Sequence, residues 1–558
     1  MSKRIVIIGG VAGGASAAAR ARRLSEDAQI IVIERGPHVS FANCGLPYHI
    51  GKEIPQREKL LLHTPESLAK RFNLDVRTRT EAVAIDRNAK TVRVKDQVGA
   101  ISQIAYDDLI LSPGAGPIRP NVPGSNARGV FTLRDIGDMD AIIAYIDEHA
   151  VKRAAVIGGG YIGVEVAEQL ACIGQKVTLV EALDQVIAPL DPEMAGILAE
   201  ELRKHLTLTL MKRFERIRTD DAGQHATGVI LDDQSVVEAE LVILGLGVRP
   251  DVSLAKNAGL EIGKLGGIAV NEYLQTSDPH IWAVGDAVEV RHLPLEQQAL
   301  IALAGPANRQ GRMAADNILL PRKKSYAGSL GTAVVRVFSK IAACTGANEK
   351  QLRRLEKPYV PLYLFPGSHA GYFPGAKSIA MKLLFHPQSR TLLGAQAVGE
   401  DGVEKRIDVL ATAIKGGLTI DEIAELELCY APPVGSAKDP VNLAGMMMQN
   451  VADGLVKTVA PGDVVQAKPD DAFLLDVRSR QELDRLGRFR SAVHIPLDEL
   501  RGRLDELPKD RPIHVFCQSG LRSYNAARIL SHHGFDVYNV TGAATALRLF
   551  QAVANPGS

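Results

Sequence analysis

Runs of apolar residues that end in glycine turns are the clearest pattern in the first half of the chain. The run RIVIIGG (4–10) is apolar at successive positions, as in a strand that is buried on both faces. A helical stretch of small residues follows, and IIVIER (30–35) is a second strand of the same kind. Residues 4–35 therefore predict one βαβ unit, and the same order recurs over 154–182. Two such units indicate two nucleotide-binding folds.

Three later stretches indicate how the two folds are connected. Residues 92–117 predict short strands with turns, AELVILGLG (239–247) predicts a strand that closes the second fold, and HIWAVGDA (280–287) returns to the first. The first fold is thus predicted to be discontinuous, with the second inserted into it. The predicted boundaries are 1–150 and 251–325 for the first fold and 151–250 for the second.

The pattern changes after about Lys324. The strands TAVVRVF, PLYLF and IAMKLLF, together with one clear helix over 403–417, predict an α+β domain over 326–445. Residues 446–465 are interpreted as a connecting linker. The final stretch, 466–558, has three short apolar strands with helices between them, which predicts a small α/β domain.

Composition and charge exclude several classes of protein. A chain of 558 residues is too long for one core. Lys+Arg 65 against Asp+Glu 64 argues against a dedicated nucleic-acid binder or a polybasic membrane protein. No apolar run reaches the roughly 18 residues that would span a bilayer. The first 19 residues imitate a signal peptide, but a strand, a glycine turn and a helix start explain them better.

The cysteines do not form a disulfide framework or a zinc pattern. There are five in the chain, with no CxxC pair and no metal-ligand spacing with histidine, so we expect no metal site. This usage predicts a reducing compartment, and we expect a cytoplasmic protein. Cys172, Cys344 and Cys429 are interpreted as packing residues.

The second glycine turn has the full G-x-G-x-x-G pattern. Gly158, Gly160 and Gly163 follow a strand and open a helix, where bare backbone amides could approach a pyrophosphate. Glu181 ends the next strand, where a carboxylate would bind ribose hydroxyls and repel a 2′-phosphate. The pattern predicts NADH, with NADPH less favoured; packing of a tight turn is the alternative.

The first glycine turn departs from that pattern, since Val11 occupies the middle glycine position. Gly9 and Gly14 keep the turn and the helix packing, and Glu34 closes the unit. A second signal is Asp286, which a strand delivers in a Gly-Asp pair. That carboxylate could bind a polyol, cap the following helix, or do both.

Together these residues resemble the flavoprotein disulfide reductases that have two dinucleotide-binding domains. The resemblance covers residues 1 to about 445. It implies that the first fold binds FAD, the inserted fold binds NADH, and the third domain forms a homodimer. It further implies FAD contacts from Gly9, Gly14, Glu34 and Asp286, with Arg134 near the flavin, and NADH contacts from Gly158, Gly160, Gly163 and Glu181.

Cys44, in SFANCGLPYHIG, indicates the branch of that family. His49 stands where a dithiol enzyme would have its second cysteine, so the motif, with Ser40 and Asn43, resembles the single-cysteine branch. That branch contains coenzyme A disulfide reductases, NADH oxidases and NADH peroxidases. Oxidase and peroxidase relatives have a histidine where this chain has Ala12.

The segment YAPPVGSAKDPVN (430–442) resembles the coenzyme A disulfide reductase signature. The resemblance implies that Tyr430 and Tyr372 reach the active site of the other subunit. A turn into a helix after Cys44 predicts a lowered thiol pKa, since a helix N-terminus favours an anion. A buried structural cysteine is the alternative.

A coenzyme A ligand would need cations for its phosphates. Arg23 and Arg71 are the preferred pair, with solvated surface charge as the alternative for each. Asn308 and Arg312 match positions that the family places along the pantetheine and phosphates. Arg20, Arg22 and Lys70 are further candidates nearby.

The last domain resembles a rhodanese sulfurtransferase over about 466–552. In CQSGLRS, Cys517 heads a loop whose amides could stabilise a thiolate or persulfide, and Arg522 opens the next helix. A phosphatase loop would need five residues between cysteine and arginine, and here there are four. The closest resemblance is therefore to fusions of coenzyme A disulfide reductase with rhodanese, or NADH-dependent persulfide reductases.

The predicted activity is reduction of persulfides, polysulfides and coenzyme A disulfide, with electrons passing from NADH through FAD to Cys44. Cys517 would be the sulfurtransferase nucleophile. Three alternatives stay open: an NADH oxidase with an accessory rhodanese domain, a non-catalytic flavin redox sensor, and a sulfur carrier in which only Cys517 acts.

Overall fold

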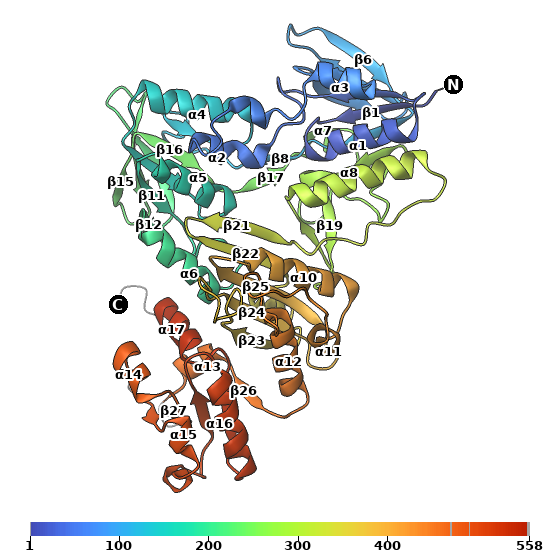
Figure 1. Cartoon of the computed structure of the whole chain (residues 1–558). Coiled ribbons are helices and arrows are strands. Elements are labelled where there is room, and N and C mark those ends of the chain that lie inside the picture. Colours follow the sequence, from blue (N-terminus) through green and yellow to red (C-terminus); the bar gives the residue numbers. More distant parts are fainter. Residues whose placement is uncertain (1, 469–470, 490, 555–558) are drawn as a thin grey trace. The chain divides into compact units, whose positions relative to one another are not determined.

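A computed structural model describes residues 2–468, 471–489 and 491–554, and Figure 1 follows the chain through its sheets. It separates into two compact units, residues 1–184 with 205–331, and residues 185–204 with 332–558.

The first unit begins with a five-stranded parallel sheet in the order β18-β7-β1-β2-β3. Its central strands are apolar at successive positions because both faces are covered, one by helices that include α1 and α8 and the other by a small antiparallel sheet of residues 81–105; Ile5, Val6 and Ile7 are fully buried. Helix α1 packs on α8 so closely that a Cβ on Gly311 would lie 2.0 Å from the Gly13 carbonyl oxygen. The elements are β1 (Arg4–Ile8), α1 (Ala12–Leu24), β2 (Gln29–Ile33), β3 (Asp75–Arg77), β7 (Asp108–Leu111), β18 (Ile281–Ala283) and α8 (Ala304–Leu319).

A second five-stranded parallel sheet follows, in the order β12-β11-β10-β16-β9. The chain then returns to the first sheet, where β18 pairs with β7. The elements are β9 (Val130–Phe131), β10 (Arg153–Ile157), α5 (Tyr161–Cys172), β11 (Lys176–Val180), β12 (Thr207–Thr209) and β16 (Leu241–Leu244).

Smaller elements complete the first unit. Two antiparallel three-stranded sheets are β4-β5-β6 (Glu81–Asp86, Thr91–Lys95, Ile101–Ala105) and β13-β14-β15 (Phe214–Thr219, Ala226–Leu231, Val236–Glu238). Two-stranded pairs are β8-β17 (Ala115–Pro117, Val248–Pro250) and β19-β20 (Glu289–His292, Gln297–Leu300). The remaining helices are α2 (Leu46–Ile50), α3 (Pro65–Phe72), α4 (Ile136–Glu148) and α7 (Ser253–Asn257).

The second unit contains an antiparallel sheet in the order β21-β22-β25-β24-β23. Helix α10 begins at Val403, the first residue of the helix predicted over 403–417, and buries Ile407 and Leu410. The elements are α6 (Pro192–Arg203), β21 (Ala333–Val337), β22 (Lys340–Gly346), α9 (Glu349–Arg354), β23 (Val360–Leu364), β24 (Ala380–Phe385), β25 (Leu392–Gly399), α10 (Val403–Gly416), α11 (Ile420–Ala424) and α12 (Pro440–Ala452).

The last sheet of this unit is parallel, in the order β26-β30-β29-β27-β28. The stretch 446–465, interpreted as a linker, is mostly regular structure: it continues α12, whose Met448 is fully buried, and supplies β26. The elements are β26 (Lys457–Val459), α13 (Pro461–Gln466), β27 (Phe473–Asp476), α14 (Arg480–Leu486), β28 (Val493–His494), α15 (Leu497–Leu500), β29 (Ile513–Phe516), α16 (Leu521–His532), β30 (Val537–Val540) and α17 (Ala543–Ala554).

Among the described residues, no helix combines the length and the apolar character needed to cross a membrane.

Candidate active site

The first glycine turn joins β1 to α1 with very close backbone contacts. A Cβ on Gly9 would lie 2.0 Å from the Ser112 carbonyl oxygen, and Gly9 has a φ of +96°, so only glycine fits. A Cβ on Gly14 would lie 1.8 Å from the Gly9 carbonyl oxygen. Glu34 accepts hydrogen bonds from the amides of Gly10 (2.9 Å) and Gly36 (2.8 Å). The acid at the end of β2 therefore holds the turn in shape.

The second turn repeats this arrangement between β10 and α5. A Cβ on Gly163 would lie 1.9 Å from the Gly158 carbonyl oxygen, so this pair fixes the turn. Gly160 differs, because no atom of the described residues, apart from its own chain neighbours, lies within 4 Å of the Cβ position. Glu181 accepts hydrogen bonds from the amides of Gly159 (2.6 Å) and Leu183 (2.8 Å). Open space at Gly160 in front of a helix start fits the pyrophosphate of a dinucleotide.

A cavity of about 650 Å³ in the first unit brings many predicted residues together. Cys44 lies on its wall, and cationic side chains lie on α1 and α8. The predicted residues that line it are Ala12, Arg20, Arg23, Ser40, Asn43, Cys44, Asn308 and Arg312; the others include Ser16, His63, Phe72 and Arg309.

Several predicted cations either lie away from the cavity or have partners within the protein. Arg71 is exposed on α3 and does not line the cavity. Arg22 is buried and donates to the backbone carbonyls of Phe72 and Asn73, so it holds the end of α3. Arg20 is paired with Asp316 at 2.5 Å. Arg23 stacks over the Phe72 ring, 5.3 Å from its centroid.

The protein around Cys44 disfavours its anion. Burial raises the pKa of the Cys44 thiol, and the negative charges of Glu165 and Asp286 raise it further. This is the opposite of the predicted lowering. The helix after Cys44, α2, has only five residues, so its dipole is small beside two carboxylates.

Asp286 and Arg134 influence each other electrostatically in the first unit. Burial raises the pKa of Asp286, against the opposing positive charge of Arg134. Burial also lowers the pKa of Arg134, whose Nη2 donates to the Pro113 carbonyl (3.1 Å). Gly285 has a φ of +82°, and its amide donates to the Gln310 side chain (2.7 Å), which fixes the turn that carries Asp286.

In the second unit, Tyr372 and Tyr430 form a pair. Their hydroxyl groups are 2.8 Å apart, and both rings are exposed. The hydrogen bond between the two hydroxyl groups raises the pKa of Tyr430. Buried Arg406 connects the two segments, because its guanidinium donates to the Ser368 carbonyl (2.8 Å) and to Asp439 (3.2 Å).

Cys517 lies in the loop between β29 and α16 with its side chain buried. The Gly520 amide donates to the Cys517 Sγ at 3.1 Å, as expected for a loop that stabilises a sulfur anion. Arg522 donates two hydrogen bonds to Glu482, each 2.5 Å long. This pairing lowers the pKa of Glu482 to about 2 and raises that of Arg522.

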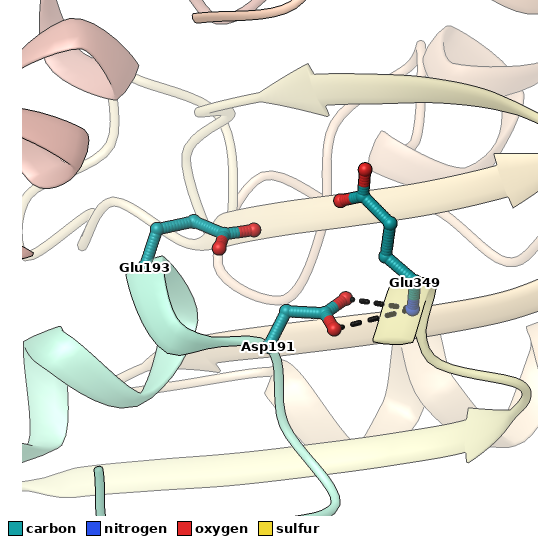
Figure 2. A group of neighbouring side chains, drawn as sticks. All are labelled: Asp191, Glu193 and Glu349. Carbon is teal, nitrogen blue, oxygen red and sulfur yellow. Dashed lines mark hydrogen bonds between the residues drawn. The ribbon is translucent and has the colours of Figure 1, made fainter. Parts of the chain in front are cut away.

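Asp191, Glu193 and Glu349 form an acidic cluster in the second unit (Figure 2). Both carboxylate oxygens of Asp191 accept from the Glu349 amide (3.1 Å each). The Lys382 ammonium lies 2.9, 2.6 and 2.5 Å from Asp191, Glu193 and Glu349 respectively. A lysine thus supplies the positive charge that a metal ion would otherwise bring to this cluster.

No two of the five cysteines, all within the described residues, form a disulfide. Cys344 is buried, as expected for a packing residue. Cys172 and Cys429 are exposed, contrary to that expectation. Cys172 is the last residue of α5, where the helix reaches the surface.

Residues 3–311 match the family described as pyridine nucleotide-disulphide oxidoreductase. The chain belongs to this family. Residues 332–440 match the dimerisation domain of the same oxidoreductases, and residues 461–548 match a rhodanese-like domain. The predicted fold class is confirmed: an α/β protein with two Rossmann-like dinucleotide-binding domains, an α+β dimerisation domain and a C-terminal rhodanese-like α/β domain.

Relatives of this oxidoreductase include named enzymes. Coenzyme A disulfide reductase from Staphylococcus haemolyticus is 35% identical over 445 residues, which is 79% of this chain and 98% of the relative. The structure of reduced CoADR-RHD from Bacillus anthracis is 48% identical, with a TM-score of 0.96, and covers 100% of this chain and 99% of its own. A NAD-dependent persulfide reductase from A. fulgidus is 38% identical, with a TM-score of 0.90, and covers 97% and 99%.

Sequence reasoning missed several residues of this oxidoreductase. His63 and Arg309 line the cavity, Glu165 acts on Cys44, and Glu482 pairs with Arg522. Arg309 could have been found by helical spacing, since it lies three residues before Arg312 on α8. The other three belong to no motif and approach their partners only in the folded chain.

Proposed function

We propose that this chain is an NADH-dependent, FAD-containing reductase of persulfides, polysulfides and coenzyme A disulfide, with a sulfurtransferase domain that acts on sulfane sulfur. The observation that carries the proposal is the position of one cysteine, Cys44, on the wall of a cavity rich in arginine. His49 occupies the place of a second cysteine, so the thiol partner of Cys44 must be the substrate.

The residues present fit the cofactors. Gly9, Gly14, Glu34, Arg134 and Asp286 would hold FAD. Gly158, Gly160, Gly163 and Glu181 would hold NADH, and the carboxylate of Glu181 disfavours the 2′-phosphate of NADPH. Together the two cofactors, when bound, supply two electrons to the disulfide bond formed at Cys44.

Cys44 performs the covalent step. With a persulfide or coenzyme A disulfide, the Cys44 thiolate attacks the sulfur that bears the organic group, a Cys44–substrate disulfide forms, and hydrosulfide or thiolate leaves. With a polysulfide, the same attack breaks an S–S bond, forms a persulfide on Cys44 and expels the rest of the sulfur chain as an anion. Two electrons and a proton then return Cys44 to a thiolate and release the bound thiol or sulfide. Arg23, Asn308 and Arg312 would hold a coenzyme A moiety in the cavity, beside Ser40 and Asn43.

Tyr372 and Tyr430 would complete the site of a partner subunit. We propose a homodimer, supported by the match to a dimerisation domain and by two exposed, hydrogen-bonded tyrosines. With a raised pKa, Tyr430 stays protonated at neutral pH and can donate a hydrogen bond to a leaving thiolate. Light scattering of the purified protein tests the dimer; a monomeric mass would contradict it.

Cys517 would accept sulfane sulfur from a donor and pass it to an acceptor thiol such as coenzyme A. Arg522, held by Glu482, supplies positive charge beside this loop. The proposed domains are 1–150 with 251–325 for FAD, 151–250 for NADH, 326–445 for dimerisation and 466–558 for sulfur transfer. A thiol at each of these two sites needs a reducing compartment, so we propose a cytoplasmic location.

The test is steady-state oxidation of NADH with polysulfide, and separately with coenzyme A disulfide, as the electron acceptor. We expect Cys44→Ser to abolish both activities, while Cys172→Ser, an exposed cysteine outside the cavity, retains them. Full activity in Cys44→Ser would overturn the proposal.

An NADH oxidase is the second candidate, because a protein of that name from Methanocaldococcus jannaschii is 36% identical over 445 residues. Ala12 lines the cavity and has no group that could assist peroxide chemistry. Oxygen consumption that equals NADH oxidation in the absence of any sulfur substrate would favour the oxidase.

A further inference from the structure

Strand β23 is an edge strand, and its outer side contacts the last sheet of the same unit. Edge strands have unpaired backbone groups that must find partners when they are buried. The backbone amide of Tyr363 donates to the Thr541 Oγ1 at 2.7 Å, and both residues are buried. Thr541, the residue after β30, thus accepts a hydrogen bond from a backbone amide at the edge of the dimerisation-domain sheet.

The contact at this junction is tight. A Cβ on Gly542 would lie only 2.6 Å from the Tyr363 Cβ and 3.1 Å from the Phe365 ring. The Tyr363 side chain is held from its other end, because its hydroxyl donates to Glu193 (2.8 Å). The Lys382 ammonium, 5.2 Å from the Tyr363 ring centroid, binds the same carboxylate. Tyr363 is therefore held in place by contacts at both ends, and its backbone amide binds Thr541 from this fixed position.

The residues after Thr541 lead directly to the Cys517 loop. The Ala544 amide donates to the Cys517 carbonyl (3.0 Å), and the Thr545 amide donates to the Gln518 carbonyl (3.2 Å). The Thr545 hydroxyl adds a bond to the same carbonyl (2.9 Å). The start of α17 therefore holds the backbone of Cys517 and of the next residue.

The backbone that leads from Thr541 into the first residue of α17 is unusual. Gly542 has a φ of +70°, and Ala543, which is not a glycine, has a φ of +53°. A left-handed alanine persists only when its surroundings hold it. The junction with Tyr363 lies directly before this alanine and the α17 amides directly after it.

We propose that Tyr363 and Thr541 are positioning residues for Cys517, so that the dimerisation domain sets the geometry of the sulfur-transfer loop. This inference rests on the proposed role of Cys517 as the sulfurtransferase nucleophile. When the Thr541 hydroxyl is lost, the turn relaxes, the start of α17 shifts, and the Cys517 sulfur moves relative to the Gly520 amide at 3.1 Å. The activity of the rhodanese-like domain therefore depends on contacts with the dimerisation domain of the same unit.

The test uses the full-length protein with thiosulfate as sulfur donor and cyanide as acceptor, a reaction that yields sulfite and thiocyanate. Thr541→Val removes the hydroxyl at constant shape, and we expect kcat to fall about fivefold, the typical effect of one lost hydrogen bond. Thr541→Ser restores the acceptor and should stay within about twofold of the native rate. Thr458→Val on β26 makes the same exchange elsewhere in this sheet and serves as the control.

A second measurement reports on the thiol directly. The rate at which iodoacetamide alkylates Cys517, followed by peptide mass spectrometry across pH, should shift to higher pH in Thr541→Val but not in Thr541→Ser. NADH oxidation with coenzyme A disulfide should be unchanged in both, which shows that the chain is folded. Gly542→Ala, which presses on Tyr363 without touching the hydroxyl, should also slow sulfur transfer.

Native kcat and a native alkylation profile in both Thr541→Val and Gly542→Ala would overturn the inference, and so would equal losses in Thr541→Ser and Thr541→Val. Cys517→Ala separates this result from failure of the proposed function. If thiocyanate formation survives in Cys517→Ala, the proposed sulfurtransferase role is wrong, while the alkylation profile still decides whether Thr541 positions Cys517.

Discussion

Around Cys44, single residues set the reactivity of the thiol. Glu165 and Asp286 place negative charge near a sulfur whose pKa burial already raises. The Asn43 side chain accepts from the Cys44 amide (3.1 Å), which fixes the local turn. The thiolate fraction of Cys44 at neutral pH is therefore smaller than that of an ordinary cysteine.

Removal of one of these charges should make Cys44 more reactive. In Glu165→Gln, the pKa of Cys44 falls because a negative charge is lost, so the pH profile of alkylation by iodoacetamide shifts to lower pH. We expect the rate at pH 7 to rise about two- to fivefold. Glu26→Gln, on an exposed loop, is the control and should leave the rate unchanged. An unchanged profile in Glu165→Gln would show that this carboxylate does not act on Cys44.

Glu181 should determine the choice of nicotinamide cofactor. In Glu181→Ala combined with Ala182→Arg, the repulsion of a 2′-phosphate is replaced by attraction. We expect the ratio of kcat/KM for NADPH to that for NADH to rise at least about tenfold. Asp184→Ala, an exposed acid three residues further on, should leave the ratio unaltered. A constant ratio in the double variant would contradict the assignment of Glu181.

At the scale of elements, the second glycine turn joins a buried strand to a helix and combines two kinds of glycine. Gly158 and Gly163 are needed for the turn itself, because a Cβ on Gly163 would overlap the Gly158 carbonyl oxygen. Gly160 has no contact at its Cβ position from any described residue beyond its chain neighbours, and its φ of −76° is one that any residue adopts. Its side-chain position is open to a ligand.

Alanine at these two positions should therefore have different effects. In Gly160→Ala, we expect a thermal midpoint close to that of the native protein but a KM for NADH raised about tenfold or more, because the methyl group occupies the place of the pyrophosphate. In Gly163→Ala, the overlap at 1.9 Å should lower the thermal midpoint itself. Native affinity for NADH in a stable Gly160→Ala protein would remove this glycine from the binding site.

At the scale of the whole molecule, one buried lysine joins segments that are far apart in sequence. Lys382 on β24 neutralises Asp191 and Glu193 from the 185–204 segment and Glu349 from α9. Burial raises the pKa values of Asp191 and Glu349, but the ammonium outweighs it, and both lie below their ordinary values. These carboxylates stabilise the fold above about pH 4.5, and that contribution is lost as the pH falls through their folded pKa values.

Lys382→Met should be strongly destabilising. It leaves three buried carboxylates without their cation, so we expect a loss of about 3–5 kcal/mol at pH 7, measured by denaturant unfolding. The loss should shrink as the pH falls, because protonation removes the uncompensated charge. Lys340→Met breaks the more exposed pair with Glu400 and should cost about 1 kcal/mol or less. Equal losses in the two variants would contradict this role of Lys382.

Most of the fold and part of the site could be predicted from the sequence. The glycine turns and the acids after β2 and β11 have fixed spacing, and apolar runs mark the parallel strands, so these features are local. Cys44 and Cys517 were identified by the residues next to them. The linker interpretation of 446–465 did not anticipate β26, since three residues of mixed polarity give no clear strand pattern and pair only with β30.

The amino-acid sequence by itself therefore determines the two glycine turns that can approach a phosphate and the positions of Cys44 and Cys517 next to turns. These features depend only on residues that are neighbours in sequence. Only the tertiary structure determines which charged groups surround each cysteine sulfur and which residues hold its loop in place. Glu165 reaches Cys44, and Tyr363 reaches Thr541, across separations of more than one hundred residues. Electrostatic and packing forces act over a few ångströms in space, and sequence distance carries no information about them.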